Sequence, residues 1–228
     1  MIETKQLFRS FKNGDVETRV LKGIDFSAAD GEFIAIMGRS GAGKSTLLYQ
    51  ISLLDHPTGG EIAIDGHKTE TMSPDARMKF RLNKFGYVFQ DYALLPELTA
   101  IENVVLPLLM QDHPRKAAYA RAADALGKVN LGHRLHNLPS QLSGGEQQRV
   151  SISRAIAHGP KILFADEPTA NLDNESSRAI MEIFTDLHKQ GQTIIMVTHE
   201  EEYAKLADRL VRLDDGKIIS ETHKRKRL

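Results

Sequence analysis

Short apolar runs separated by turn residues open the chain and predict a β-rich start. Residues 2–8 and 20–26 each form such a run, and an Asn-Gly turn dipeptide lies between them at 13–14. A third run, residues 33–37, is apolar without interruption, as in a strand that is buried on both faces of a sheet. Residues 61–64 add a short strand before another turn. We therefore expect strands in this part of the chain.

The pattern becomes helical over residues 91–159. Thr99 and Glu102 have the spacing of a capping box, in which the two side chains satisfy backbone N–H groups at a helix start. Residues 116–129 are rich in Ala and favour a helix, and a Gly-Pro pair at 159–160 ends the helical region. We therefore expect a helical insertion between two parts of the fold.

Two apolar runs after the helical region predict strands at residues 162–165 and 193–197, with a helix over residues 176–189 between them. A strand, a helix and a second strand in this order predict a parallel sheet, because parallel neighbours need a crossover connection. Residues 210–220 contain two short runs around an Asp-Asp-Gly turn and predict a closing hairpin. The predicted fold class is α/β, with a β-rich start and a helical insertion.

Composition and charge narrow the function without identifying it. Hydrophobic residues make up 41% and charged residues 26% of the 228 residues, which is typical of globular proteins. The 30 basic residues balance the 30 acidic residues, and this neutrality argues against a dedicated nucleic-acid-binding protein. The absence of cysteine excludes disulfides, cysteine-ligated zinc and thiol catalysis. No apolar run approaches the roughly 20 residues of a membrane-spanning helix, and no signal peptide is expected, so a membrane role would require a partner.

Residues 38–45 fit the pattern G-x-x-x-x-G-K-[ST], between a predicted buried strand and a predicted helix. The glycines let backbone N–H groups converge on phosphate oxygens, and the helix start adds a partial positive charge. We expect Lys44 to reach the β- and γ-phosphates and the Ser45 hydroxyl to bind Mg²⁺. A glycine-rich turn without a ligand is the alternative. The predicted nucleotide-binding residues of this loop are Gly38, Arg39, Ser40, Gly41, Ala42, Gly43, Lys44, Ser45 and Thr46.

Two acidic residues, Asp166 and Glu167, directly follow the apolar run 162–165. They are expected at the carboxyl end of a parallel strand, where open α/β sheets bind ligands. An aspartate at this place can hold Mg²⁺, and the adjacent glutamate can polarise an attacking water. The alternative is an acidic helix N-terminus, since Pro168 follows.

His199 follows the predicted strand 193–197. Three strands would then deliver Gly38, Asp166 and His199 to one edge of the sheet. This placement favours a contact of His199 with the γ-phosphate or the attacking water. An ordinary surface histidine is the alternative, since the chain contains nine.

A second predicted anion site lies in residues 142–147, with the sequence LSGGEQ. Ser143 and Glu146 form a capping box, so a helix is expected to start at Gly144. Two glycines in the first turn leave backbone N–H groups bare. Each glycine lowers helix stability by about 1 kcal/mol, and this cost favours a functional reason for their presence. Because the chain already has a complete phosphate loop, we expect Ser143 and Gly145 to serve a nucleotide held by another subunit. A helix that is merely well capped is the alternative.

Together these segments resemble the ATP-binding subunit of an ABC transporter, over nearly the whole chain. Residues 38–45 resemble the Walker A motif, residues 162–167 resemble Walker B with its glutamate, and residues 142–147 match the ABC signature. Gln90 resembles the Q-loop glutamine, and the segment Asn171, Leu172 and Asp173 resembles the D-loop. A signature sequence together with Walker A is specific to this superfamily.

The resemblance implies ATP and Mg²⁺ as cofactors and assigns roles to single residues. Phe11 resembles the aromatic residue that stacks on adenine, and His199 resembles the switch histidine. The residues implied in catalysis are Glu167, His199 and Gln90. The residues implied in binding Mg²⁺ are Ser45, Gln90 and Asp166. Besides the phosphate loop, the residues implied in binding the nucleotide are Phe11, Ser143, Gly144, Gly145 and Asp173.

The resemblance also implies an architecture and partners. Residues 1–228 would form a single ABC ATPase domain with a P-loop NTPase (RecA-like) core, an N-terminal antiparallel β-subdomain, and a helical subdomain at 91–159. Two copies would pack head to tail, with each ATP between one Walker A motif and the other copy's signature. An integral membrane permease subunit would hold the dimer at the cytoplasmic face of the inner cell membrane. No nucleic-acid partner is expected.

A finer resemblance favours one branch of the superfamily. Residues 54–58 and 94–104 are similar to the ATPases of lipoprotein-releasing and macrolide-exporting systems. Residues 39–43 are also similar to the cell-division subgroup, which implies regulation of a membrane partner without transport. A P-loop kinase would not need residues 142–147. Export therefore leads, regulation is the alternative, and a kinase ranks last.

Two further segments have both a functional and a structural interpretation. Residues 92–98 are apolar, and the resemblance favours a groove for a short helix of the membrane partner over local core packing. Residues 224–227 are all basic, so they could contact anionic lipid, although a solvated tail is the default.

Overall fold

The computed structural model describes residues 2–224 and divides the chain into two compact units. The first unit comprises residues 1–78 and 191–228, and the second comprises residues 79–190. Residues 224–227 are the basic run for which a solvated tail is expected and a lipid contact is the alternative, and residues 225–227 lie outside the described range. Within that range, no helix is both long and apolar enough to cross a membrane.

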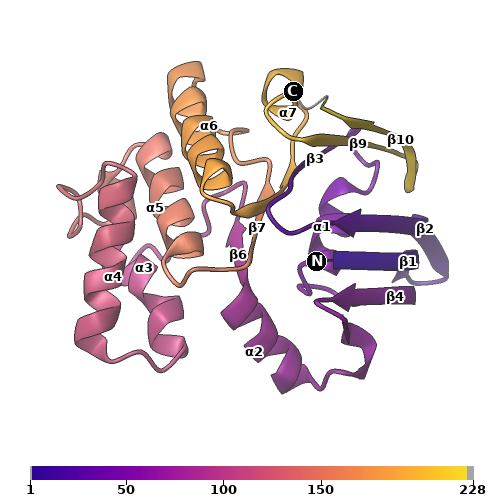
Figure 1. Cartoon of the computed structure of the whole chain (residues 1–228), viewed down its shortest axis with the longest axis horizontal. Helices are drawn as coiled ribbons and strands as arrows, with labels where there is room; N and C mark the ends of the chain where they lie inside the picture. Colours follow the sequence, from indigo (N-terminus) through magenta and orange to yellow (C-terminus); the bar gives the residue numbers. More distant parts are fainter. Residues whose placement is uncertain (1, 225–228) are drawn as a thin grey trace. The chain divides into compact units, whose positions relative to one another are not determined.

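The predicted β-rich start is an antiparallel sheet in the first unit. Strands β1 (Ile2–Asn13) and β2 (Val16–Ala28) pair along their whole length around a turn at Gly14, whose φ is 60°. Strand β4 (Gly59–Ile64) pairs with the other edge of β1, and the short β5 (His67–Lys68) completes the order β2-β1-β4-β5 (Figure 1). Both long strands extend beyond their apolar runs, because backbone pairing continues where side chains are exposed.

The other sheet strands of the first unit are built around β3 (Phe33–Met37), in which all five residues are buried. It pairs in parallel with β8 (Thr193–Val197) on one side and with β9 (Arg209–Asp214) on the other. Strand β10 (Lys217–His223) forms the predicted hairpin with β9. The uninterrupted apolar run of β3 therefore marks a central strand, as predicted.

The remaining elements of the first unit are short. Helix α1 (Lys44–Ile51) follows β3, and the four-residue α7 (Glu201–Ala204) follows β8. Helix α2 (Pro74–Lys84), which begins in the first unit, was missed in the sequence analysis. Its only buried residue is Arg77, so it lacks the apolar stripe by which an amphipathic helix is recognised.

The second unit combines a pair of parallel strands with four helices of the described chain. Strand β6 (Phe85–Val88) pairs with β7 (Ile162–Asp166). The four helices are α3 (Ala100–Met110), α4 (Arg115–Lys128), α5 (Gly144–Ile156) and α6 (Asn174–Lys189) (Figure 1). Strand β6, which is only four residues long and contains Gly86, was also missed.

Helices α3, α4 and α5 share one hydrophobic core, to which they contribute Val104, Leu108, Ala122, Leu126 and Val150 among others. The capping box of Thr99 and Glu102 is present at the start of α3, and α4 begins one residue before the predicted 116. All three helices lie within residues 91–159. The boundary of a helical subdomain at these residues stays a prediction.

Candidate nucleotide site

The phosphate loop joins β3 to α1 in the first unit, as its sequence predicts. Gly43 is the N-cap of α1 and has a φ of 98°, and Gly41 has a φ of 77°. Both values lie in the left-handed region, which residues with a Cβ atom rarely adopt. In the described structure no side chain caps this helix start, so the helix presents backbone N–H groups and its partial positive charge at the loop. These properties fit a phosphate ligand.

The middle of the phosphate loop is exposed, whereas its end is buried. Arg39 and Ser40 are exposed, whereas Ala42 and Lys44 are buried. The Lys44 ammonium group donates a hydrogen bond to the Arg39 carbonyl at 3.1 Å, so its side chain lies along the loop. Ser45 occupies the first turn of α1 and is half-buried. A phosphate group over this loop would meet a cation and a hydroxyl group from the same helical turn.

The β9–β10 hairpin packs against the phosphate loop. The Gly216 N–H group donates to the Ala42 carbonyl at 3.1 Å, and the Gly216 carbonyl accepts from the Lys22 N–H group at 2.9 Å. A Cβ atom on Gly38 would lie 2.1 Å from the Leu213 carbonyl oxygen. The first glycine of the motif is thus required by close packing against this hairpin.

We expect Gly38→Ala to lower the free energy of unfolding by about 1–3 kcal/mol, the usual cost of overpacking. Gly127→Ala is the matched control, because a Cβ atom at Gly127 in α4 meets no atom within 4 Å in the described structure. The control should be neutral or stabilising by up to about 1 kcal/mol. Urea unfolding of both variants checks the pair. If Gly38→Ala and Gly127→Ala were equally stable, this would show that the hairpin moves to accommodate the methyl group added at Gly38.

His199 lies at the same sheet edge as the phosphate loop. Ile36 of β3 and Val197 of β8 are partners in a parallel register, and Gly38 and His199 each follow two residues later. The His199 side chain is exposed. The predicted shared edge is therefore present for these two residues, and Asp166 belongs to the second unit.

Phe11 lies near the turn of the β1–β2 hairpin, opposite Thr18, and is 44% exposed. The Arg9 guanidinium carbon lies 4.3 Å from the centre of the Phe11 ring. An exposed aromatic ring at this place can stack on a base, and that role of Phe11 stays a prediction.

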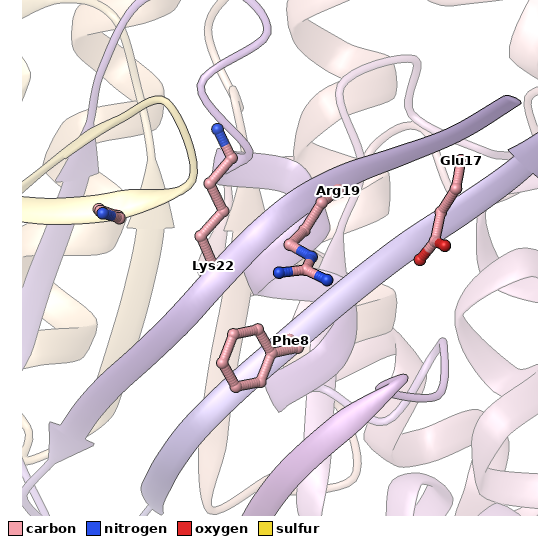
Figure 2. A pocket seen from close by; sticks show the side chains of 5 residues that line it. Phe8, Glu17, Arg19 and Lys22 are labelled. Carbon is pink, nitrogen blue, oxygen red and sulfur yellow. The ribbon is translucent and has the colours of Figure 1, made fainter.

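A hollow of about 560 Å³ lies beside the same hairpin, and Figure 2 shows the side chains that line it. Its lining residues are Phe8, Glu17, Arg19, Lys22 and Lys217. The Arg19 guanidinium carbon is 5.9 Å from the centre of the Phe8 ring, and Lys22 forms an ion pair with Asp215 at 2.6 Å. Since side chains alternate along a strand, Phe8 and Phe11 point to opposite faces of the hairpin. The hollow is therefore distinct from the face that carries Phe11.

In the second unit, the parallel pair β6 and β7 brings two predicted residues together. Val88 and Ala165 are partners in the register, and Gln90 and Glu167 each follow two residues later. Asp166 is the last residue of β7 and is 5% exposed. Glu167 has a φ of 44° and is half-buried. The two acidic residues thus lie at a strand end, as predicted.

The alternative of an acidic helix N-terminus is wrong, because α6 begins only at Asn174. Among residues 2–224, no group of three or more His, Cys, Asp or Glu residues could hold a metal ion. Mg²⁺ in nucleotide sites commonly uses one or two carboxylates together with phosphates and water. A single aspartate such as Asp166 therefore fits Mg²⁺ that arrives with a nucleotide.

A side chain of helix α5 forms hydrogen bonds with the segments that follow β6 and β7. The fully buried Gln148 donates from its amide group to the Pro168 carbonyl at 2.7 Å and to the Phe89 carbonyl at 3.5 Å. The Asn171 side chain donates to the Gln90 carbonyl at 3.1 Å. Gln148 was not singled out from the sequence, and Asn171 was noted only within the segment that resembles the D-loop. Their role depends on contacts with distant carbonyl groups, which no local pattern reveals.

The predicted capping box at the start of α5 is confirmed. The Ser143 hydroxyl accepts from the Glu146 N–H group, and the Glu146 carboxylate accepts from the Ser143 N–H group at 2.8 Å. Arg134 also donates to Glu146 at 3.2 Å. The hydrogen bond from the Ser143 backbone is the main cause that holds the pKa of Glu146 below its ordinary value, and burial opposes it. The helix start at Gly144 is thus firmly fixed.

The two glycines of this helix start have a packing role that the sequence did not reveal. A Cβ atom on Gly144 would lie 2.9 Å from the Tyr92 hydroxyl, and one on Gly145 would lie 2.8 Å from the Ser176 hydroxyl. A side chain at either position would have to displace the end of a neighbouring side chain, so close packing favours these two glycines. Their role toward a nucleotide stays a prediction.

Asp173 is the N-cap of α6. One carboxylate oxygen accepts from the Ser176 N–H group at 2.8 Å, and the other accepts from the Ser176 hydroxyl at 3.0 Å. These bonds, the backbone one first, hold the pKa of Asp173 below its ordinary value. Ser176 therefore bonds to the end of the predicted D-loop and occupies the space that a side chain at the signature glycine Gly145 would need. The nucleotide-binding role of Asp173 also stays a prediction.

Comparison with known proteins gives consistent matches. The sequence profile of the family described as "ABC transporter" matches residues 21–170. The uncharacterized ABC transporter ATP-binding protein MJ1508 of Methanocaldococcus jannaschii is 48% identical over 219 residues, which cover 96% of this chain and 98% of that protein. The lipoprotein-releasing system ATP-binding protein LolD of Aquifex aeolicus is 46% identical over 202 residues, which cover 89% of this chain and 90% of that protein.

A longer relative and a solved structure complete the comparison. The macrolide export ATP-binding/permease protein MacB of Aggregatibacter actinomycetemcomitans is 49% identical over 225 residues. The match covers 99% of this chain but 35% of MacB, so the chain spans about a third of that relative. The dimeric structure of the ATP-binding cassette MJ0796 bound to ADP and Pi has a TM-score of 0.92 and 39% identity, and the match covers 98% of both chains.

Proposed function

Because the chain belongs to the ABC transporter family of ATP-binding cassettes and is an ABC-type ATPase, we propose that it powers a membrane export complex by ATP-driven head-to-tail dimerisation. The observation that carries this proposal is the pair of helix starts at the phosphate loop and at residues 142–147. The first, at α1, has no side-chain cap among the described residues and suits phosphate, whereas the second, at α5, is capped by Ser143 and matches the ABC signature. A single nucleotide needs only the first, so the proposal assigns Ser143 and the glycines of the second to the nucleotide of another copy.

The residues divide the chemistry between them. Lys44 and the loop backbone bind the phosphates, and Phe11 stacks on the base. Ser45, Asp166 and Gln90 hold Mg²⁺, which supplies charge neutralisation on the phosphates when it is bound. Glu167 orients and polarises the attacking water, and His199 contacts the γ-phosphate.

The second copy contributes Ser143, Gly144 and Gly145 to each nucleotide, with Asp173 near the shared boundary. The similarity to MJ0796 supports this arrangement, because that cassette is described as dimeric with ADP and Pi bound. ATP closes such a dimer, since its phosphates contact both copies, and hydrolysis removes part of that contact. The cycle of closing and opening is the motion that a membrane partner would use.

The proposed partner is an integral membrane permease subunit, which would hold the protein at the cytoplasmic face of the inner cell membrane. LolD belongs to a lipoprotein-releasing system, and MacB carries a permease in its name. The apolar segment 92–98 is the proposed docking groove. The buried Asn103 accepts from the Leu95 N–H group at 2.8 Å and donates to the Leu98 carbonyl at 2.9 Å, and Leu95 is 46% exposed. Asn103 thereby fixes a loop that presents an apolar side chain.

Regulation of a membrane partner without transport is the second candidate, because the phosphate loop is also similar to the cell-division subgroup. Reconstitution with a co-purifying membrane partner separates the two functions. ATP-dependent movement of a substrate would support export. ATP-dependent change in the partner's activity, with no substrate moved, would support regulation.

The two-copy site is tested by Ser143→Arg, which places bulk and positive charge at the start of α5. We expect hydrolysis to be lost while the isolated monomer still binds ATP, because the phosphate loop lies in the other unit. Phosphate release and equilibrium binding of ATP measure the two properties separately. Full hydrolysis by this variant alone would exclude the two-copy site.

A mixture of Ser143→Arg with Lys44→Ala is the control. Each mixed dimer can contain at most one complete half-site, made from the intact loop of one variant and the intact signature of the other. Ser143→Ala, which removes the hydroxyl without adding bulk, should have a smaller effect than Ser143→Arg.

A further inference from the structure

Arg9 connects the exposed ring of Phe11 to the end of α1. Its guanidinium carbon lies 4.3 Å from the ring centre, within the range of a cation–π contact. The same guanidinium group forms an ion pair with Asp55: Nη2 donates a hydrogen bond to one carboxylate oxygen at 3.0 Å, and Nε lies 2.8 Å from the other oxygen. The Arg9 and Asp55 side chains are 20% and 29% exposed. The stacked cation is therefore held by a partly buried, hydrogen-bonded partner of opposite charge.

The position of Asp55 is fixed by the way α1 ends. Leu53 adopts a φ of 62°, and the N–H groups of Leu54 and Asp55 both donate to the Tyr49 carbonyl, at 2.9 and 3.1 Å. This left-handed turn is a common helix end, here built on a residue that is not glycine. The chain is thereby turned so that the Asp55 side chain reaches β1.

Two buried side chains hold Asp55 from the other side. Gln50 of α1 is fully buried and donates from its amide group to the Asp55 carboxylate at 2.9 Å. Arg77 is 3% exposed and donates to the backbone carbonyls of Asp55 and Leu53. Asp55 therefore joins the helix that starts at the phosphate loop to the strand that carries Phe11.

We propose that Arg9 and Asp55 are positioning residues that hold the Phe11 ring as the stacking surface for the adenine base of ATP. The inference rests on the proposed function, because it takes Phe11 as the adenine-binding residue. It assigns a role to Asp55 within residues 54–58, a segment that the sequence analysis related to one branch of the superfamily without giving it a function.

The physical effect has two parts. The guanidinium group covers one ring face and restricts the rotation of Phe11, so less conformational freedom is lost when a base stacks on the ring. Its charge also draws the π-electrons of the ring toward it, which favours an electron-rich base on the opposite face. Neither part acts on the phosphates, which bind at the start of α1.

Comparing the affinities for two ligands therefore separates an effect of Arg9 and Asp55 on base stacking from an effect on phosphate binding. ATP contacts both the ring and the phosphate loop, whereas inorganic tripolyphosphate contacts only the loop. We expect Asp55→Ala and Arg9→Gln each to weaken Mg-ATP binding about three- to tenfold and to leave Mg-tripolyphosphate binding unchanged in titration calorimetry. Phe11→Ala should weaken ATP binding by at least as much, because base stacking on the ring is lost altogether.

The variants also test the connection between the residues. Asp55→Ala in the Phe11→Ala background should cause no further loss of ATP affinity, because both changes remove the same contact. Arg9→Gln is the second variant because it leaves the Gln50 contact of Asp55 in place. Glu61→Ala is the control, since it removes another carboxylate of the same unit, paired with Lys68 at 3.5 Å, and should change neither affinity.

Three results would overturn the inference. Unchanged ATP affinity in Arg9→Gln and Asp55→Ala would show that the pair does not position the ring. An equal loss of tripolyphosphate affinity would show that the pair acts through α1. Additive effects of Asp55→Ala and Phe11→Ala would show separate roles. Failure of the wild-type protein to bind either ligand would instead contradict the proposed function, so the two failures are distinguishable.

Discussion

Glu167→Gln is expected to lower the rate of ATP hydrolysis about 10²–10⁴-fold while nucleotide affinity is kept. Glutamine has nearly the shape of glutamate but cannot accept a proton from the attacking water. Glu167 is suited to the role because it directly follows Asp166, the last residue of β7, and lies two residues beyond Ala165, as Gln90 lies two residues beyond its register partner Val88. The substitution also removes a negative charge that would face the γ-phosphate.

Loss of hydrolysis and of this charge should together favour the closed dimer. The Glu167→Gln variant should therefore elute at the dimer mass in size-exclusion chromatography with Mg-ATP, whereas the wild-type protein reopens after hydrolysis and stays mostly monomeric. Glu182→Gln on the exposed surface of α6 is the matched control and should behave as wild type. Turnover at the wild-type rate, or a variant that stays monomeric at saturating ATP, would remove Glu167 from the catalytic role.

Lys44→Ala is expected to abolish measurable ATP binding. The lysine is the main cation of the phosphate loop, and truncating one member of a buried, hydrogen-bonded charge pair costs roughly 2–5 kcal/mol, or about 30- to several-thousand-fold in affinity. Its side chain is 7% exposed and already lies along the loop, bonded to the Arg39 carbonyl, so little rearrangement is needed to meet a phosphate.

Equilibrium titration with Mg-ATP measures this loss, and Lys189→Ala is the control. Lys189 is exposed at the end of α6 and pairs only at the surface with Asp186, at 2.9 Å. It should bind ATP as the wild-type protein does. Binding of Mg-ATP by Lys44→Ala within threefold of wild type would mean that the phosphate loop was wrongly identified.

ATP hydrolysis by the wild-type protein tests the remaining alternative function, that of a P-loop kinase. A P-loop kinase transfers its phosphate to an acceptor molecule, whereas the proposed ATPase needs only water. Release of phosphate without any added acceptor would exclude the kinase. It would leave export and regulation to the reconstitution experiment.

Features that depend on neighbouring residues were predictable from the sequence. The phosphate loop, the capping boxes of Thr99 and Ser143, and the buried strand β3 each depend on contacts within a few residues or on one continuous apolar run. The position of Asp166 at the end of β7 was also predictable, because this residue directly follows one continuous apolar run. In these cases the residue types nearly fix the backbone conformation, so the pattern identifies the element and its chemistry together.

The tertiary structure decided what depends on segments that are distant in the chain. Arg9 and Asp55 are 46 residues apart, and only the end of α1 brings them together beneath Phe11. Gly38 must be glycine because of the Leu213 carbonyl, a reason that the motif itself does not contain.

The glycines of the signature show the same division most clearly. The sequence determined that a capped helix starts at Gly144, because the capping box is local. It suggested bare N–H groups for an anion, and the structure adds that the side chains of Tyr92 and Ser176 lie close to the two glycines, where a Cβ atom would displace them. Strand pairing and helix packing set such distances between segments, and no pattern of neighbouring residues specifies them.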